Sequence, residues 1–425
     1  MSQHANHRSL ELGGALCLLL IAATPLAAQP AEQTLAAALK QHVVQLAAPE
    51  HGGRGPGSTG IERAQAYIEA QFEAIGLTPG GSNGYVASFT PTAAEAGSEI
   101  LPEAGGWGAL ELHNVVGVLK GKDEAAGALV LSAHYDHLSR KATGELYPGA
   151  DDNASGVAAL LELARRLKQE APLRRTIVFL ASSGEEEGLL GAKAYCAAPT
   201  VPLGSTYAGL NFDTIGRMTD RKLYLFGVAS AAEWPEITRS VNLAYGFELV
   251  TPEKAPFASD QAAFFDHGIP VLHFFTGPNL DYHRESDTAE KLDYAALGEI
   301  VSYAVDLTVF LAEREEPRRF VPPGAAAVKP MAPAGGPRRV SLGTIPDFAK
   351  ESGGVLLSGV TPGSPAEAAG FQKGDVLIEL GGTPVDNLSD FTAALKDHQP
   401  GDKVTVTVQR GAEKISKEVT LVERK

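Results

Sequence analysis

The chain has 425 residues and a formal net charge of −15 at neutral pH. This length is too great for one ordinary domain and suits two or three. The acidic excess argues against nucleic acids and anionic membranes as partners, because both are negatively charged and would repel the chain.

Residues 1–28 have the pattern of a secretory signal peptide. A weakly basic start precedes an apolar run over residues 13–23, and the small residues Ala27 and Ala28 follow it. The run is too short to stay in a membrane as a spanning helix. We therefore predict cleavage near Ala28, no membrane span after the signal is removed, and an exported protein that is periplasmic or extracellular. Cys17 lies too deep in the run for a good lipoprotein signal.

Residues 32–313 are predicted to form one domain. Two helices come first, over residues 34–47 and 60–77, and Gly76 ends the second. Short apolar runs then alternate with helical patterns, which predicts an α/β fold with a mostly parallel (mixed) central sheet flanked by helices. The predicted strands are 128–136, 176–183, 208–216, 222–228 and 270–277, and the later helices are 156–169 and 294–313.

Residues 314–339 are rich in Pro, Ala and Gly and are predicted to be a linker. Residues 340–425 contain short strands and two short helices, and SPAEAAGFQKGDVLIELGGTPV within them resembles a PDZ domain. In that family the loop at residues 341–345 would receive the terminal carboxylate of a peptide ligand. Its sequence, SLGTI, departs from the usual Gly-apolar-Gly-apolar form. A packing or assembly role without a peptide ligand therefore stays open.

Polar residues gather just past the carboxyl ends of the predicted strands. Open α/β sheets place their sites at this edge, so these side chains can converge. His, Asp and Glu without thiolates suit zinc or a similar divalent metal. The residues are His134, Asp136, His137, Asp151, Asp152, Glu185, Glu186, Glu187, Asp213, Tyr282 and His283.

The acidic residues in this group indicate how many metals the site would hold. Two zinc ions bring four positive charges. Asp152, Glu186 and Asp213 would offset three of them, and a hydroxide would offset the fourth. Without metal the cluster would repel itself strongly. A paired metal site therefore explains the doubled acids in PGADDNASGV and SGEEEG.

HYD, PGADDNASG, SGEEEGLLGA, NFDTIG and YHRESDT occur in this order and together resemble the co-catalytic zinc exopeptidases of the bacterial leucyl aminopeptidase type. The resemblance runs from about residue 114 to residue 306. Each motif alone is weak, but five in order, each at a strand end, are specific. The resemblance implies a zinc-dependent aminopeptidase (a metallo-exopeptidase) that removes N-terminal residues from peptides with a free N-terminus.

The resemblance also implies a ligand set for two Zn²⁺ ions. His134 and Asp213 would hold one ion, Glu186 and His283 would hold the other, and Asp152 would bridge them. Co²⁺ or Mn²⁺ would suit the same ligands.

The remaining roles follow from the same resemblance. Glu185 would be the general base that takes a proton from the water bridging the metals. Asp136 would hydrogen-bond the far nitrogen of His134, and Asp151 would support the loop. Tyr282 would help to stabilise the oxyanion. For Asp260 the sequence supports two roles equally, a contact with the substrate and a helix cap.

Three other functions stay open. A carboxypeptidase of the same superfamily would need a basic pocket, to which Arg217 or Arg284 would contribute. A glutaminyl cyclase-like enzyme would use one zinc. An inactive metal-binding scaffold would act through its PDZ module. The aminopeptidase is favoured because the sequence has no basic cluster and retains every ligand position and the base.

Several other histidines, one glutamate and one cysteine are predicted to lie outside the metal site. His137, three residues beyond His134, is expected on the loop, and Glu187 is expected to be a solvated acid. Cys196 is expected to be a buried small side chain. The histidines expected at the surface or in packing are His42, His51, His113, His267 and His273.

Overall fold

The structure is a computed structural model that describes residues 30–91, 110–138, 144–252, 259–322, 340–347, 350 and 352–423. The predicted signal peptide and most of the predicted linker lie outside the described residues.

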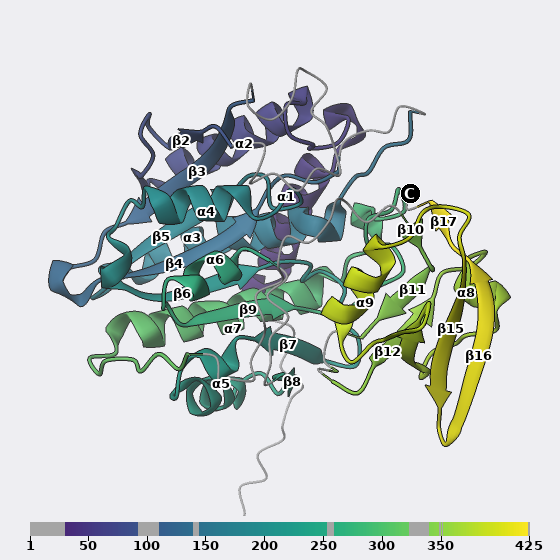
Figure 1. The fold of residues 1–425 in the computed structure, drawn as a ribbon. Coiled ribbons are helices and arrows are strands. Elements are labelled where there is room, and N and C mark those ends of the chain that lie inside the picture. Colours follow the sequence, from purple (N-terminus) through teal and green to yellow (C-terminus); the bar gives the residue numbers. More distant parts are fainter. Residues whose placement is uncertain are drawn as a thin grey trace, which may run out of the picture.

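A nine-stranded sheet forms the centre of the larger domain, in the order β1-β3-β5-β4-β6-β9-β7-β8 with β2 beside β3 (Figure 1). The pairs β5–β4, β4–β6, β6–β9 and β7–β8 are parallel, and the others are antiparallel. The predicted mixed central sheet is therefore confirmed, with four of its eight strand pairs parallel. The strands are β1 (Thr78–Pro79), β2 (Val86–Phe89), β3 (Leu112–Leu119), β4 (Ala128–His134), β5 (Thr176–Ser182), β6 (Thr206–Phe212), β7 (Lys222–Phe226), β8 (Glu248–Val250) and β9 (Val271–Phe275).

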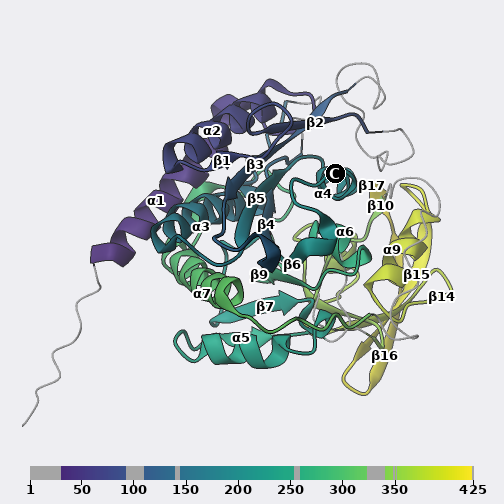
Figure 2. The same ribbon diagram turned by 90° about the vertical axis from the view of Figure 1, so that its left-hand side faces the viewer.

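Helices cover both faces of this sheet (Figure 2). Strand β5 shows why, because Ile177 and Phe179 pack into one core while Val178 and Leu180 pack into another on the opposite face. A strand buried on both faces reads as a continuous apolar run. The first core lies under α1 (Pro30–Leu46), α2 (Thr59–Ile75), α3 (Gly156–Glu170), α5 (Trp234–Asn242) and α7 (Tyr294–Glu313), and the second lies under α4 (Leu190–Ala197) and α6 (Gln261–Asp266).

Helix α2 shows how local sequence sets an element's limits. The Ser58 side chain accepts a hydrogen bond from the amide of Ile61 and caps the start of the helix. At the other end Gly76 adopts the left-handed conformation, as the sequence predicts. Ile68 and Phe72 lie one turn apart on the buried face.

Strand β3 and helices α4 and α5 were not predicted. Strand β3, LHNVVGVL, pairs with β5 in the antiparallel direction. It is buried along almost its whole length, so it lacks the alternation that marks a half-buried strand. Gly117 in its middle packs against Phe72 and Leu77, where a Cβ would come within 3 Å of their side chains. The glycine that interrupts the pattern is therefore required by packing.

Helix α7 is long and apolar enough to cross a membrane by length and composition alone. It contacts α1, α3 and α5, and Leu297, Ile300 and Leu307 are fully buried against them. Its apolar character is thus used in the core of the domain.

The first residues of the predicted linker pack onto the larger domain. Phe320 forms a β-bridge with Ala231, and the Tyr207 hydroxyl donates to the carbonyl of Glu316 (3.1 Å). Arg319 pairs with Glu233 at 2.9 Å. These contacts hold the chain against the domain as far as Phe320.

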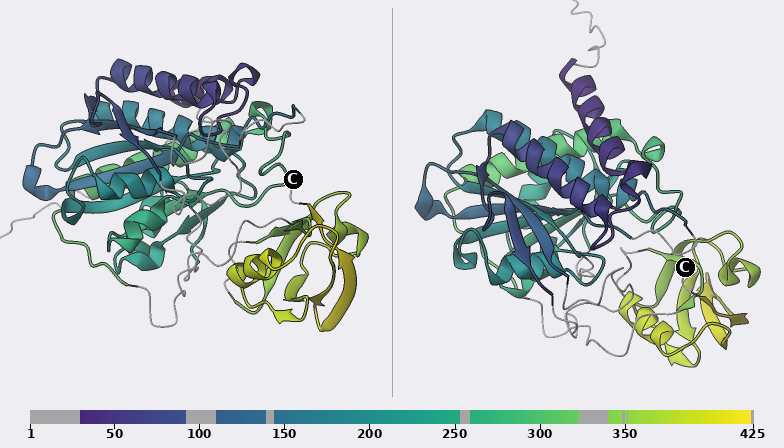
Figure 3. Two further views of the ribbon diagram at one scale, coloured as in Figure 1. Left: turned by 45° about the horizontal axis from the view of Figure 1, so that its top comes forward. Right: turned by 90° about the horizontal axis from the view of Figure 1, so that it is seen from above.

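The smaller domain stands beside the larger one and has a separate core (Figure 3). The two domains touch where Arg284 Nη2 donates to Thr361 Oγ1 (3.1 Å). The domain contains a sheet in the order β11-β12-β13-β15-β16 with β14 beside β13, and a separate β10–β17 pair. Its elements are β10 (Val340–Ser341), β11 (Thr344–Pro346), β12 (Val355–Val360), α8 (Pro365–Ala368), β13 (Val376–Leu380), β14 (Thr383–Pro384), α9 (Leu388–Lys396), β15 (Lys403–Arg410), β16 (Glu413–Thr420) and β17 (Val422–Glu423).

Candidate metal centre

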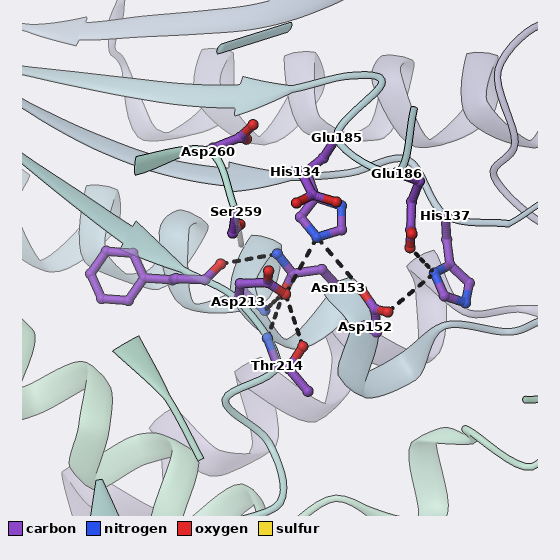
Figure 4. A network of polar contacts seen from close by, with 12 residues as sticks. His134, His137, Asp152, Asn153, Glu185, Glu186, Asp213, Thr214, Ser259 and Asp260 are labelled. Carbon is purple, nitrogen blue, oxygen red and sulfur yellow. Dashed lines mark hydrogen bonds and ion pairs between the residues drawn. The ribbon is translucent and has the colours of Figure 1, made fainter. Parts of the chain in front are cut away.

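The parallel strands bring the predicted polar residues together at one edge of the sheet. Strand β4 ends at His134, and its neighbours β5 and β6 lead directly to Glu185, Glu186 and Asp213. Asp152 lies in the turn that opens α3. Figure 4 shows these side chains converging.

Asp152 presents its two carboxylate oxygens to two different groups. Its Oδ1 lies 3.5 Å from His134 Nε2, which is 3.3 Å from Asp213 Oδ1. Its Oδ2 lies 2.9 Å from His283 Nε2, which is 3.2 Å from Glu186 Oε2. The arrangement therefore divides the predicted ligands into two sets that share one aspartate.

The distances in the His134 set and the buried polar atoms in the His283 set both support divalent metal ions. Ligands at 2.0–2.2 Å around a tetrahedral zinc lie roughly 3.3–3.6 Å from one another, close to the separations around His134. Asp152 Oδ2 and His283 Nε2 are buried and face each other, but neither has a hydrogen-bond partner among the described residues. Buried polar atoms normally have partners. A cation between them would satisfy both.

His137 lies on the loop after β4, as expected, but its side chain enters the site. Its side chain is fully buried, and its Nδ1 is 3.0 Å from Glu186 Oε1 and 3.7 Å from Asp152 Oδ2. Because β4 ends at His134, the residues after it follow an irregular path, and strand periodicity gives no indication of where His137 points.

Asp136 supports the site in a different way from the one predicted. The Nδ1 of His134 lies 3.2 Å from the main-chain carbonyl of Asp136, whereas the Asp136 carboxylate is 3.7 Å away. That carboxylate accepts hydrogen bonds from the amides of Glu185 (3.2 Å) and Glu186 (3.3 Å). Asp136 thus orients His134 through its backbone and fixes the Glu185–Glu186 turn through its side chain.

Asp151 belongs to the support of the loop, as predicted, and its main acidic neighbour is Asp287, which had no predicted role. The Asp287 carboxylate accepts the amides of Asp151 (3.0 Å) and Asp152 (3.1 Å). Asp151 in turn accepts from the amide of Gly216 (2.7 Å) and the side chain of Asn279 (3.0 Å). Burial and the neighbouring Asp287 charge raise the pKa of Asp151 well above its usual value. The first aspartate of the pair therefore anchors the turn that presents the second.

Arg54 is a further supporting residue that the sequence did not reveal. Its guanidinium is buried and donates to the carbonyls of Tyr135 (2.9 Å), Leu46 (3.0 Å), Pro148 (2.7 Å) and Gly149 (2.8 Å). It therefore ties the end of α1 to both metal-site loops. Burial lowers its pKa to about 10, and nearby carboxylates oppose that effect. All four acceptors are backbone atoms, so no sequence motif marks them.

The acids of the site differ in protonation behaviour in the metal-free protein. Burial raises the pKa of Glu185 well above its usual range, although the charge of His134 opposes this. Burial would also raise the pKa of Glu186, but His283 and His137 outweigh it and hold that pKa well below the usual value. Glu186 is thus placed to remain a charged ligand, whereas Glu185 is placed to exchange a proton.

Tyr282 and Asp260 lie in contrasting environments. Tyr282 is 46% exposed, and its ring stacks on His283 with the centroids 3.9 Å apart. Asp260 is fully buried and precedes α6, but its side chain makes no capping hydrogen bond. Instead its carboxylate accepts a hydrogen bond from Ser182. Burial raises the pKa of Asp260 to about 6.

The structure also places the two arginines considered for a carboxypeptidase pocket and the residues expected outside the site. Arg217 is paired with Asp281 at 2.8 Å, and Arg284 is turned towards the smaller domain. Cys196 is buried, as expected. Glu187 was expected to be a solvated acid, but it is only 2% exposed. His273 is buried and contacts Asn211, which agrees with a packing role.

Comparison with curated proteins finds relatives for part of the larger domain. Aminopeptidase YwaD of Bacillus subtilis is 29% identical over 207 residues, covering 45% of this chain and 44% of the relative. A probable zinc metalloprotease of Leptosphaeria maculans is 36% identical over 168 residues, covering 36% of this chain and 38% of the relative. The chain thus spans less than half the length of these two relatives.

Comparison with solved structures shows the same fold. The zinc aminopeptidase BSAP from Bacillus subtilis superposes with a TM-score of 0.54 at 17% identity, covering 66% of this chain and 95% of that one. Porphyromonas gingivalis glutaminyl cyclase gives 0.53 at 20% identity, covering 64% and 97%. Family models match residues 114–308 as peptidase family M28 and residues 343–421 as a PDZ domain. The chain therefore carries a domain of peptidase family M28 followed by a PDZ domain.

Proposed function

We propose that this protein is an exported di-zinc aminopeptidase. The observation that carries the proposal is the position of Asp152, whose two oxygens face two separate His–carboxylate sets. In this assignment His134 and Asp213 would hold one Zn²⁺, Glu186 and His283 would hold the other, and Asp152 would contribute to both positions. Co²⁺ or Mn²⁺ would suit the same oxygen and nitrogen ligands.

The bound metals would supply Lewis acidity, which polarises a peptide carbonyl and makes water easier to deprotonate. Glu185 supplies the base. Its carboxylate takes a proton from the attacking water and later gives it to the leaving amine. The amides of Glu185 and Glu186 are held by Asp136, so this turn is fixed before substrate binds.

Two contributions to substrate binding remain proposals. The exposed Tyr282 stands beside His283 and would donate its hydroxyl to the developing oxyanion. Asp260 is buried against Ser182, so it is assigned to shaping the pocket wall rather than to capping α6.

Two rival activities have less support. A carboxypeptidase needs cationic side chains free to bind the substrate carboxylate, but Arg217 and Arg284 are already engaged. A glutaminyl cyclase-like enzyme shares the fold, as the Porphyromonas gingivalis structure illustrates. One zinc would leave one of the two ligand sets around Asp152 without a cation. Both sets are complete here, which favours two metals.

The activity is tested by incubating the zinc-loaded protein with an unblocked peptide and following the products by mass spectrometry. Matched samples carry an acetylated N-terminus or an amidated C-terminus. The proposal predicts shortening from the N-terminus that acetylation abolishes and amidation does not. Shortening from the C-terminus would assign the carboxypeptidase instead. Release of ammonia from an N-terminal glutamine would assign the cyclase.

The PDZ domain is proposed to bind the carboxyl end of a peptide beside β11. Strand β11 pairs with β12 alone among the described strands, so its other edge is available for a ligand strand. Gly343, in the loop before β11, has φ +76°, and a Cβ there would come 2.2 Å from Ser364. Fluorescence anisotropy with peptides ending in a free or amidated carboxyl group tests this, because only the free acid should bind. Equal binding, or none, would favour an assembly role.

Export is proposed from residues 1–28. Expression of the full chain in a bacterial host, followed by fractionation and N-terminal sequencing, should place the mature protein outside the cytoplasm with a new terminus near residue 29. Retention in the cytoplasm with residues 1–28 still attached would contradict it.

A further inference from the structure

His137 is a buried histidine to which the proposed mechanism gives no role. Its side chain has no exposed surface, although it lies among the acids of the metal centre. Its Nδ1 is 3.0 Å from Glu186 Oε1 and 3.7 Å from Asp152 Oδ2. His283 approaches the same two carboxylates at 3.2 and 2.9 Å, and the two imidazole rings are 5.7 Å apart in an edge-to-face arrangement.

The fold holds the His137 ring in this place. Its backbone amide donates to the carbonyl of Arg54 (3.1 Å), whose side chain ties the same loops together. Gly149 packs directly against the ring, with φ +59°, and a Cβ there would come 2.4 Å from His137 Cδ2. The chain therefore leaves space for an imidazole beside Glu186 by keeping a glycine opposite it.

We propose that His137 is a fourth protein ligand of the metal position formed by Glu186, His283 and Asp152. This inference rests on the proposed two-metal function. The donor set would be two imidazole nitrogens and two carboxylates, which zinc accepts in a tetrahedral arrangement. The donor atoms of His137, Asp152 and Glu186 lie within 4.8 Å of one another. His283 approaches the same Asp152 oxygen as His137, at 2.9 Å, and the other oxygen of Glu186, at 3.2 Å.

With His137 included, the two metal positions are unequal. The position of His134, Asp213 and Asp152 has three protein ligands and one open corner, as catalytic zinc sites do. The other position has four protein ligands, which is the closed set typical of tightly held zinc. One position is thus built to hold its metal and the other to exchange ligands during turnover.

A competing role for His137 uses the same geometry. Its Nδ1–H would donate a hydrogen bond to Glu186 and orient that carboxylate, without touching the metal. An asparagine at position 137 separates the two roles, because its amide group reaches roughly where Nδ1 lies and can still donate. It is a poor substitute for an imidazole as a zinc ligand. Alanine removes both functions.

The test measures metal retention by His137→Asn, His137→Ala and wild type, with His267→Asn as a control at the exposed histidine that follows α6. Each zinc-loaded protein is dialysed against graded chelator, and zinc per chain is measured by mass spectrometry. Wild type and the control should release zinc in two steps. In both His137 variants the zinc affinity of the tighter step should fall at least ~100-fold, and the weaker step should stay in place. Loss of a supporting hydrogen bond would lower the zinc affinity only roughly 10- to 100-fold.

The outcomes are distinct. A His137→Asn protein that keeps the tight step and the Co²⁺ absorption spectrum of wild type would overturn the ligand assignment in favour of the hydrogen bond. A wild type that releases both metals in one step would overturn the inequality of the positions. If wild type retains fewer than two metals, the proposed two-metal function fails instead.

A second measurement does not depend on how well the variants fold. X-ray absorption at the zinc edge of wild type holding one equivalent of zinc should show two imidazole ligands. A single imidazole would overturn the proposal.

Discussion

Asp152 Oδ2 lies 2.9 Å from His283 Nε2, and both atoms are buried without a hydrogen-bond partner among the described residues. The other oxygen of the same carboxylate faces His134 Nε2 at 3.5 Å. One side chain therefore links the loop after β9 to the end of β4. This relationship is the basis of the two-metal proposal, and the consequences for metal binding follow from it.

Asp152→Ala should reduce bound zinc below one ion per chain, because the substitution removes a ligand from both positions. Asp213→Ala removes a ligand from one position only and should leave about one ion per chain. Zinc content after gel filtration, measured by mass spectrometry, checks both. Equal zinc content in the two variants would contradict a bridging role for Asp152.

Glu185→Gln should lower kcat by roughly 10²- to 10⁴-fold, the usual contribution of a general base. Zinc content should stay at the wild-type level, because Glu185 is assigned to proton transfer and not to metal binding. Steady-state kinetics on an unblocked peptide with parallel zinc analysis measure both quantities. Glu170→Gln, which changes an exposed acid at the end of α3, serves as the matched control. Retained activity in Glu185→Gln would exclude it as the base.

Arg54→Gln should destabilise the metal-free protein by about 3 kcal/mol or more, because several buried carbonyls lose a charged donor together. Arg54→Lys should recover only part of this loss, since an ammonium cannot span carbonyls from three segments at once. Urea unfolding followed by fluorescence of the buried Trp234 measures the change. The control Arg63→Gln alters an exposed arginine on α2 and should change stability by less than ~0.5 kcal/mol. A similar small change at Arg54 would show that its hydrogen bonds do not support the loops.

Glu162 gives a pH-dependent contribution to stability away from the metal centre. Its carboxylate is buried between α1 and α3, where it is 2.9 Å from Arg165 Nε and 3.4 Å from His42 Nε2. Burial favours protonation, but the hydrogen bonds from His42 and Arg165 outweigh it and lower the pKa of Glu162 below its usual value. Because the folded-state pKa lies below the unfolded one, the stabilisation is present at neutral pH and disappears as the pH falls through the folded-state pKa.

Glu162→Gln should therefore cost about 1–2 kcal/mol at pH 7 and progressively less towards pH 3. Urea unfolding of the metal-free protein at both pH values provides the measurement. The control is Glu170→Gln, an exposed acid at the end of the same helix. A cost that does not change with pH would show that the ionised carboxylate is not the stabilising form.

Much of the fold and the position of the site could be predicted because strong local patterns carry them. The apolar runs that became β4, β5 and β6 are bordered by polar residues, and parallel strands must bring those residues to one edge. The limits of α7 were predicted exactly, and Gly76 ends α2 as expected. Strand β3 was missed because it is buried on both faces and contains Gly117, which packing rather than strand propensity requires.

The supporting residues could not be predicted because their partners are distant in sequence. Arg54 bonds to backbone carbonyls some 80 to 95 residues away as well as to Leu46 nearby. Asp287 accepts amides from residues about 135 positions earlier. His137 lies beyond the end of its strand, where no periodicity applies. Their positions past the strand ends and the resemblance to zinc exopeptidases identified the acids and histidines, but only the tertiary structure shows how they are oriented.

The most direct measurement is an anomalous difference map at the zinc edge from crystals of the zinc-loaded protein. We predict two peaks about 3.5–4 Å apart, the usual separation in two-metal sites, with one on either side of the Asp152 carboxylate. A single peak, or two peaks that do not share Asp152, would contradict the two-metal account.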